Sequence, residues 1–114
     1  MEDVEGLMKE INSPVELLAI LTILFPEFAS EFEADEKVTT YHQVVLRLAP
    51  VIAGYLEVAP ARIEGFCDLV NAMVDARGDK ENAMSTCLLE HASQVNLNRT
   101  IRPYLSAAAK EQLR

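Results

Sequence analysis

Residues 60–95 read PARIEGFCDLVNAMVDARGDKENAMSTCLLEHASQV, and this stretch decides the fold class. Its apolar residues recur every three or four positions on both sides of Gly78, which is the spacing of amphipathic helices. We therefore expect one helix over residues 60–77 and a second over residues 80–95. Gly78 supplies a left-handed stop and Asp79 an N-cap, so the short turn between the two helices predicts an antiparallel pair.

Two capping boxes extend the helical pattern toward the N-terminus. Residues 13–16 (Ser-Pro-Val-Glu) and 40–43 (Thr-Tyr-His-Gln) each place a hydroxyl three positions before a side chain that can bond back to the backbone. The first box begins a helix that ends at Pro26 and is apolar nearly all round, so we expect it to be central. The second begins a long helix over residues 40–58. Pro50 predicts a kink or a break in that helix, because proline has no amide hydrogen.

Three shorter helices complete the pattern, and they are expected over residues 3–11, 26–34 and 104–113. No segment shows the sustained alternation and hairpin signals of β-strands. With 114 residues, half of them apolar, the chain is long enough to bury one hydrophobic core. The sequence therefore predicts a single all-α domain over residues 1–114. Its expected form is a compact bundle of six or seven helices that includes antiparallel helix hairpins.

Negative charge is concentrated in the first third of the chain. The sequence contains 18 acids and 10 bases, a net charge of −8, and residues 1–36 alone contain ten acids and one base. Such a field repels nucleic acid and anionic lipid and attracts a basic protein. The simpler alternative is a solvated surface that keeps the protein soluble. Five of the acids fall within ten residues: Glu27, Glu31, Glu33, Asp35 and Glu36.

Residues that carry chemistry are few. Cys87 and His91 stand four apart, which is a metal-ligand spacing, but two ligands do not make a zinc site. We expect instead a histidine packed beside core cysteines, with both thiols reduced because the sequence shows no export signal. The sequence has no phosphate-binding loop, nucleophile elbow or dinucleotide fingerprint, and no apolar run of transmembrane length. We expect a cytoplasmic protein without enzymatic activity, metal, cofactor, nucleic-acid partner or membrane contact.

Four short strings resemble segments of one protein family. Residues 24–28 spell LFPEF, residues 77–79 and 82–91 carry a helix turn and the segment after it, and residues 101–105 begin a closing helix. Together they resemble an uncharacterised family of small acidic all-helical bacterial proteins with an LFPEF-type N-terminal motif, over most of residues 15–114. Some members of that family accompany bacterial toxins as immunity proteins. The resemblance therefore implies an all-helical fold and a role in toxin immunity.

These observations leave two functional hypotheses. The first is an immunity protein that binds and neutralises a cognate bacterial toxin, with a basic toxin domain as its partner. In that case Phe28 and Phe32, if partly exposed, are aromatic anchors within an acidic rim; otherwise they staple their helix to the core. The second is a non-catalytic helical adaptor or structural domain with HEAT-like helix pairs, which binds another protein or itself. The candidate partner-binding residues are Glu27, Phe28, Glu31, Phe32, Glu33, Asp35 and Glu36.

Overall fold

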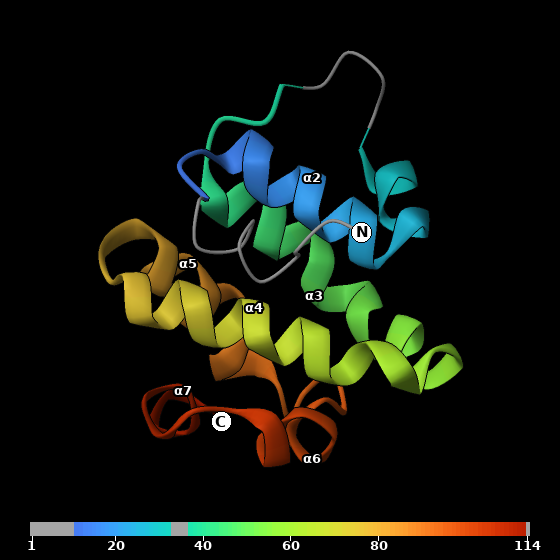
Figure 1. Ribbon diagram of the computed structural model, residues 1–114, viewed down its shortest axis with the longest axis vertical. Helices are drawn as coiled ribbons and strands as arrows, with labels where there is room; N and C mark the ends of the chain where they lie inside the picture. The colour runs from blue at the N-terminus through green and yellow to red at the C-terminus, as the bar shows by residue number, and fades with distance from the viewer. Residues whose placement is uncertain (1–10, 33–36, 114) are drawn as a thin grey trace.

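The computed structural model describes residues 11–32 and 37–113, and every regular element in these ranges is helical. The α-helices are α2 (Pro14–Leu24), α3 (Tyr41–Val58), α4 (Ile63–Ala76), α5 (Gly78–Cys87), α6 (Asn98–Ile101) and α7 (Ala107–Gln112). The 3₁₀ helices are η1 (Pro26–Glu31), η2 (Pro60–Arg62), η3 (Leu89–His91) and η4 (Arg102–Tyr104). The predicted all-α bundle is confirmed (Figure 1). The helix predicted over residues 3–11 lies outside the described ranges except for Ile11, which is buried.

The helices α3, α4 and α5 form the middle of the molecule, where α5 packs against both of the others. On one side of this trio lie α2 and η1, and on the other side lie α6 and α7 (Figure 1). The aromatic centre of the core joins the first side to the middle. The ring of Phe25 stacks on Tyr55 at 5.6 Å and meets the edge of Phe66 at 5.9 Å. In the described ranges no polar or charged side chain is buried, so the core is wholly apolar.

Both predicted capping boxes are confirmed. The Ser13 hydroxyl accepts a hydrogen bond from the Glu16 amide at 3.2 Å, and the Thr40 hydroxyl accepts one from the Gln43 amide at 3.0 Å. The Glu16 and Gln43 side chains bond back to the amide of the residue before each cap, at 2.9 Å in both boxes. These bonds satisfy amides that have no partner within the helix, which is why α2 and α3 begin where the sequence predicts.

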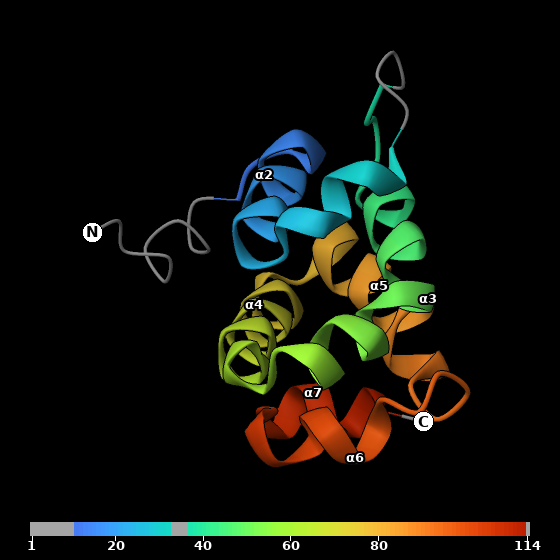
Figure 2. The same ribbon diagram turned by 90° about the vertical axis from the view of Figure 1, so that its right-hand side faces the viewer.

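Pro50 does not break α3, which continues through it as one helix. In Figure 2 the path of α3 bends partway along its length. Pro50 is exposed, as is Leu46, whose carbonyl would otherwise accept the missing amide hydrogen bond. Water can solvate a carbonyl on that face. The kink therefore costs little free energy there, and the alternative expectation of a break is wrong.

The prediction that α2 is central is also wrong, because α2 lies at the edge of the bundle. Leu17 and Leu21 are fully buried, yet Val15 is 59% exposed and Ile23 is 51% exposed. Together with the exposed Ala19, these two residues form an apolar stripe with a spacing of four residues. An apolar sequence all round a helix predicted burial on every side, and the folded chain covers only part of α2.

The helix pair α4–α5 forms as predicted, but its turn is built differently. Helix α4 ends at Ala76 and α5 begins at Gly78, so one residue separates them. Arg77 has φ 59° and ψ −175°, a backbone region occupied almost only by glycine, and Gly78 has φ 63°. The expected cap at Asp79 is wrong, since no side chain caps α5 and Asp79 lies in its first turn. The Arg77 guanidinium donates to the Glu81 carboxylate at 2.7 Å and steadies the turn.

The helix predicted over residues 80–95 ends early. It stops at Cys87 and gives way to η3 and a turn that includes Asn96, whose φ is 59°. Leu88 and Leu89 are both fully buried. The helix is interrupted at Leu88, whose φ of −124° and ψ of −62° depart from the α-helical values, and this change of backbone direction accompanies the burial of both leucines.

The closing helix predicted over residues 104–113 is likewise shorter, because a side chain of α4 interrupts it. Asn71 donates to the Tyr104 carbonyl at 3.1 Å and accepts from the Ser106 amide at 2.8 Å. The Ser106 hydroxyl then accepts from the Ala109 amide at 3.2 Å and caps α7. Similarly, the helix expected over residues 26–34 is the 3₁₀ helix η1, which ends at Glu31.

Candidate functional site

The predicted partner-binding residues divide between the surface of η1, its interior and undescribed positions. Glu27 is exposed on η1, and Glu31 and Phe32 are partly exposed at its end. Phe28 is fully buried. The remaining predicted residues, Glu33, Asp35 and Glu36, lie outside the described part of the chain.

The two phenylalanines of this segment have different surroundings. Their rings meet edge to face at 5.6 Å, with Phe28 inside the core and Phe32 above it. Phe28 is therefore the staple that the sequence offered as the alternative, and its ring is not available as an exposed anchor. Of the two rings, that of Phe32 presents aromatic surface beside the acids.

Two arginines that the sequence interpretation missed lie against this segment. Arg62, at the end of η2, bonds the Glu27 carboxylate at 3.0 Å and lies 5.7 Å over the ring of Phe25. Arg47 of α3 donates to the Glu31 carbonyl at 2.6 Å and lies 5.1 Å over the ring of Phe32. Each arginine thus holds the backbone or a carboxylate of η1 while its planar group covers an aromatic ring. No local signal reveals these contacts, because the partners are 16 and 35 residues apart.

The two arginines do not cancel the effect of the acids of η1 on neighbouring groups. Tyr55 lies next to it, and its pKa is raised, first by burial and then by the charges of Glu31 and Glu27. A second acidic location lies near the other end of α3. There the pKa of Tyr41 is raised by burial and then by Glu16 and Asp79. The fold therefore brings an acid from α5 and an acid from α2 within electrostatic reach of the same tyrosine, which the linear charge count could not show.

The histidines and cysteines do not form the arrangement expected from the sequence. His91 is exposed, with Nδ1 3.2 Å from the Gln94 side-chain oxygen, so the packed histidine beside core cysteines is wrong for this residue. Cys87 lies instead near the carbonyl of His42, at 3.9 Å. Cys67 is fully buried on α4, and burial followed by the charge of Asp68 raises its pKa to about 12. Within residues 11–32 and 37–113 no group of three potential metal ligands occurs.

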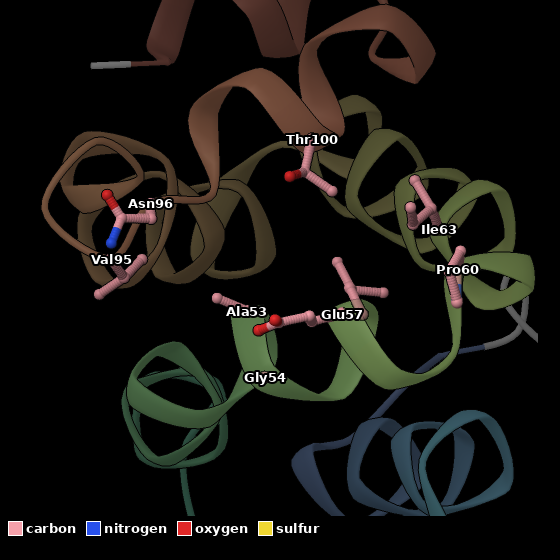
Figure 3. Close-up of a pocket in the computed structure, with 9 residues that line it drawn as sticks. Ala53, Gly54, Glu57, Pro60, Ile63, Val95, Asn96 and Thr100 are labelled. Atoms are coloured by element: carbon pink, nitrogen blue, oxygen red, sulfur yellow. The ribbon is translucent and has the colours of Figure 1, made fainter.

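A hollow that the sequence did not predict lies between α3, the start of α4 and α6 (Figure 3). Its volume is about 410 Å³. It is lined by Ala53, Gly54, Leu56, Glu57, Pro60, Ile63, Val95, Asn96 and Thr100. Figure 3 shows the Glu57 side chain extending along the α3 side of the hollow and the Thr100 hydroxyl reaching in from α6. The lining residues of α3 are far in sequence from Val95, Asn96 and Thr100. No local pattern therefore predicts that these residues line one hollow.

Within the described residues, no helix has both the length and the apolar character needed to cross a bilayer. Comparisons of the chain with protein-family models, with curated proteins and with solved structures gave no match.

Proposed function

We propose that this protein is a cytoplasmic, non-catalytic immunity protein that binds and neutralises a basic toxin domain through the acidic surface of η1. The observation that carries the proposal is the uneven charge, with ten acids against one base in residues 1–36 and a net charge of −8 overall. Electrostatic steering by such a field speeds the encounter with a basic partner. The likeness of residues 24–28 to the LFPEF motif favours a toxin as that partner.

The way η1 is held supports this role. Phe28 fixes the segment to the core, while Arg47 and Arg62 hold it from α3 and η2. A binding segment that is ordered before the encounter loses less conformational entropy when it binds. Glu27 and the half-buried Phe32 then present a carboxylate and an aromatic ring on one short segment, a combination that suits the rim and the centre of a protein interface.

A second candidate function, the helical adaptor, is favoured by a different surface. Val15, Ala19 and Ile23 form the exposed apolar stripe of α2. An apolar stripe on a surface helix suits packing against another helix, from a second protein or from a second copy. This surface requires no acidic residues, so the two proposals make separate predictions.

The decisive experiment is neutralisation of a toxin in cells. The tagged protein is used to capture partners from its native bacterium, and a captured basic protein is then expressed alone and together with this chain. Growth arrest by the partner alone and restored growth on co-expression would support the immunity proposal. Capture that survives reversal of Glu27 and Glu31 to lysine, but is lost on Val15→Glu with Ile23→Glu, would support the adaptor instead. Circular dichroism of each variant shows whether it remains folded.

A further inference from the structure

The hollow between α3, the start of α4 and α6 has a polar and an apolar part. Its walls include the apolar side chains of Ile63, Pro60 and Val95 (Figure 3). A carboxylate and a hydroxyl lie at its α3 and α6 sides, from Glu57 and Thr100. Small-ligand sites combine apolar walls with a few polar groups in this manner, in hollows of roughly 300–1,000 Å³.

The polar groups of the hollow are available to a ligand. Among the described residues, neither the Glu57 carboxylate nor the Thr100 hydroxyl has a hydrogen-bond or ion-pair partner. This differs from η1, where Glu27 is paired with Arg62. A carboxylate only accepts hydrogen bonds and a hydroxyl can also accept, so the pair suits a ligand that donates.

Gly54 enlarges the hollow on its α3 side. It lies in the interior of α3, where glycine destabilises a helix relative to alanine because it retains more freedom in the unfolded chain. Packing within the protein does not require glycine here, since an added Cβ would meet no atom within 4 Å. Because Gly54 lines the hollow, a long side chain at this position would take up space beside Glu57.

We propose that this hollow binds a primary alkylammonium group, with the ammonium between Glu57 and Thr100 and the alkyl chain against Ile63 and Pro60. An ammonium offers three donors and a positive charge to the carboxylate and the hydroxyl. The alkyl stem matches the apolar walls. The group can belong to a free amine or to a lysine side chain of a protein. The proposal does not depend on the acidic surface of η1.

The test titrates n-butylamine, as its hydrochloride, and n-butanol into the isotopically labelled protein, at matched ionic strength and constant pH. Amide chemical shifts of Gly54, Asn96 and Thr100 report occupancy. The amine should give saturable shifts at these amides in the millimolar range, and the neutral alcohol should bind more weakly. Equal affinity for amine and alcohol, or no saturable shift with the amine up to tens of millimolar, would overturn the proposal.

Three variants test whether Glu57 supplies the charge that binds the amine and whether the amine occupies the space beside Gly54. Glu57→Gln should weaken butylamine binding roughly threefold to fivefold, the upper end of the effect expected of an exposed ion pair. The matched control Glu111→Gln removes the same charge from α7, outside the hollow, and should leave binding unchanged. Gly54→Leu should fill the space and weaken both probes, with its fold checked by circular dichroism. Equal losses in Glu57→Gln and Glu111→Gln would overturn the proposal, because only the net charge would then matter.

A second titration distinguishes the sources of the ammonium group. Nα-acetyl-lysine methylamide carries the same stem and charge on a peptide backbone. If it binds as tightly as butylamine, with the same dependence on Glu57, the hollow accepts a lysine side chain of a protein. If only butylamine binds in this way, the hollow is a site for free amines. Failure of both probes would overturn this inference and leave the proposed toxin immunity untouched, because that proposal is read out at η1.

Discussion

The η1 surface and the α4–α5 pair hold their shapes by opposite means. Segment η1 depends on contacts with groups distant in sequence: its own Phe28 packs in the core, and two arginines from α3 and η2 hold its surface. The turn of the α4–α5 pair depends on the local backbone of Arg77 and Gly78. The sequence therefore predicted the position of the turn and the apolar pattern of the helices on either side of it. The contacts that hold η1 became visible only in three dimensions. The consequences of disturbing the two regions should differ in the same way.

The largest effect should come from the two phenylalanines of η1. Phe28→Ala leaves a cavity in the core and should lower the free energy of unfolding by about 3–5 kcal/mol. Phe32→Ala removes a half-buried ring and its contact with Arg47, and should lower it by about 1 kcal/mol. Urea denaturation of both variants measures the difference. Equal losses would mean that Phe32 belongs to the core as fully as Phe28, and that η1 presents no aromatic surface.

The next effect concerns the rate of partner binding. Reversal to lysine of the five acids Glu27, Glu31, Glu33, Asp35 and Glu36 should slow association with the captured partner by about tenfold or more at low salt. Its salt dependence should also flatten, because steering is screened beyond a Debye length of about 8 Å at physiological ionic strength. Stopped-flow fluorescence gives both quantities.

The control for this reversal is a matched change elsewhere. Five exposed acids lie outside η1: Glu64, Asp68, Asp75, Glu90 and Glu111. Reversal of all five to lysine shifts the net charge by the same amount. An unchanged rate in the variant of residues 27–36, or the same slowing in both variants, would mean that these acids form only a solubilising surface.

Opposite signs are expected from the two residues of the α4–α5 turn. Gly78→Val should lower the free energy of unfolding by about 1 kcal/mol or more, because a β-branched residue resists positive φ. The cause is the backbone, since an added Cβ would meet no atom within 4 Å. Arg77→Gly should raise it by about 1 kcal/mol, because the strain released is larger than the contribution of the exposed Glu81 pair. Thermal denaturation measures the free energy of unfolding of both variants. A lower free energy of unfolding in Arg77→Gly would contradict the backbone strain at this position.

The same pair of helices carries both cysteines, and the buried thiol of Cys67 should make the stability of the fold depend on pH. The pKa of Cys67 is raised by burial to about 12, whereas an unfolded thiol titrates near 8.5. Above the unfolded value the unfolded chain loses a proton that the folded chain retains, so the stability of the fold should fall as the pH rises from about 9 toward 12. Cys67→Val should flatten that decline in denaturation measured against pH.

Thiol modification provides the second measurement. In the native protein at pH 8 a thiol reagent should modify Cys87, which is partly exposed, before the fully buried Cys67. Modification of Cys67 should require unfolding. Equal native rates at the two thiols, or an alkaline decline that persists in Cys67→Val, would contradict the burial of this thiol.

The contrast between local and distant signals also explains how much of the fold the sequence revealed. Ser13 and Thr40 fix helix starts with hydroxyls three residues from their partners, and both starts were predicted. The end of α5 and the interruption before α7 were not, because the burial of adjacent leucines and the bonds of Asn71 depend on packing. The apolar pattern predicted that α2 is buried, but only tertiary structure decides which helices are covered on every side.

The candidate site was predictable to a smaller extent. Composition identified the acids of η1, and the spacing of its phenylalanines left two roles open that only burial could decide. The hollow gave no sequence signal at all, since Gly54 and Thr100 are 46 positions apart on elements that meet only in the folded chain. Charge counted along the sequence is therefore a poor measure of charge on a surface. The densest acidic stretch contains a carboxylate paired with arginine, while Glu57 at the hollow has no such partner within residues 11–32 and 37–113.

The smallest effect should come from that paired carboxylate. Both side chains of the Glu27–Arg62 pair are more than a third exposed, at 39% and 36%, so solvent screens their attraction. Arg62→Met keeps much of the packing over Phe25 and should change the free energy of unfolding by less than about 1 kcal/mol, with the difference shrinking in high salt. The same substitution should also change the rate of partner binding. Loss of the guanidinium leaves Glu27 unneutralised and should speed association with a basic partner at low salt. The matched change Arg102→Met removes a positive charge from η4 and should leave the rate nearly unchanged. If Arg62→Met slows association instead, Arg62 contacts the partner directly, and the binding surface includes the arginine of η2 as well as the acids of η1.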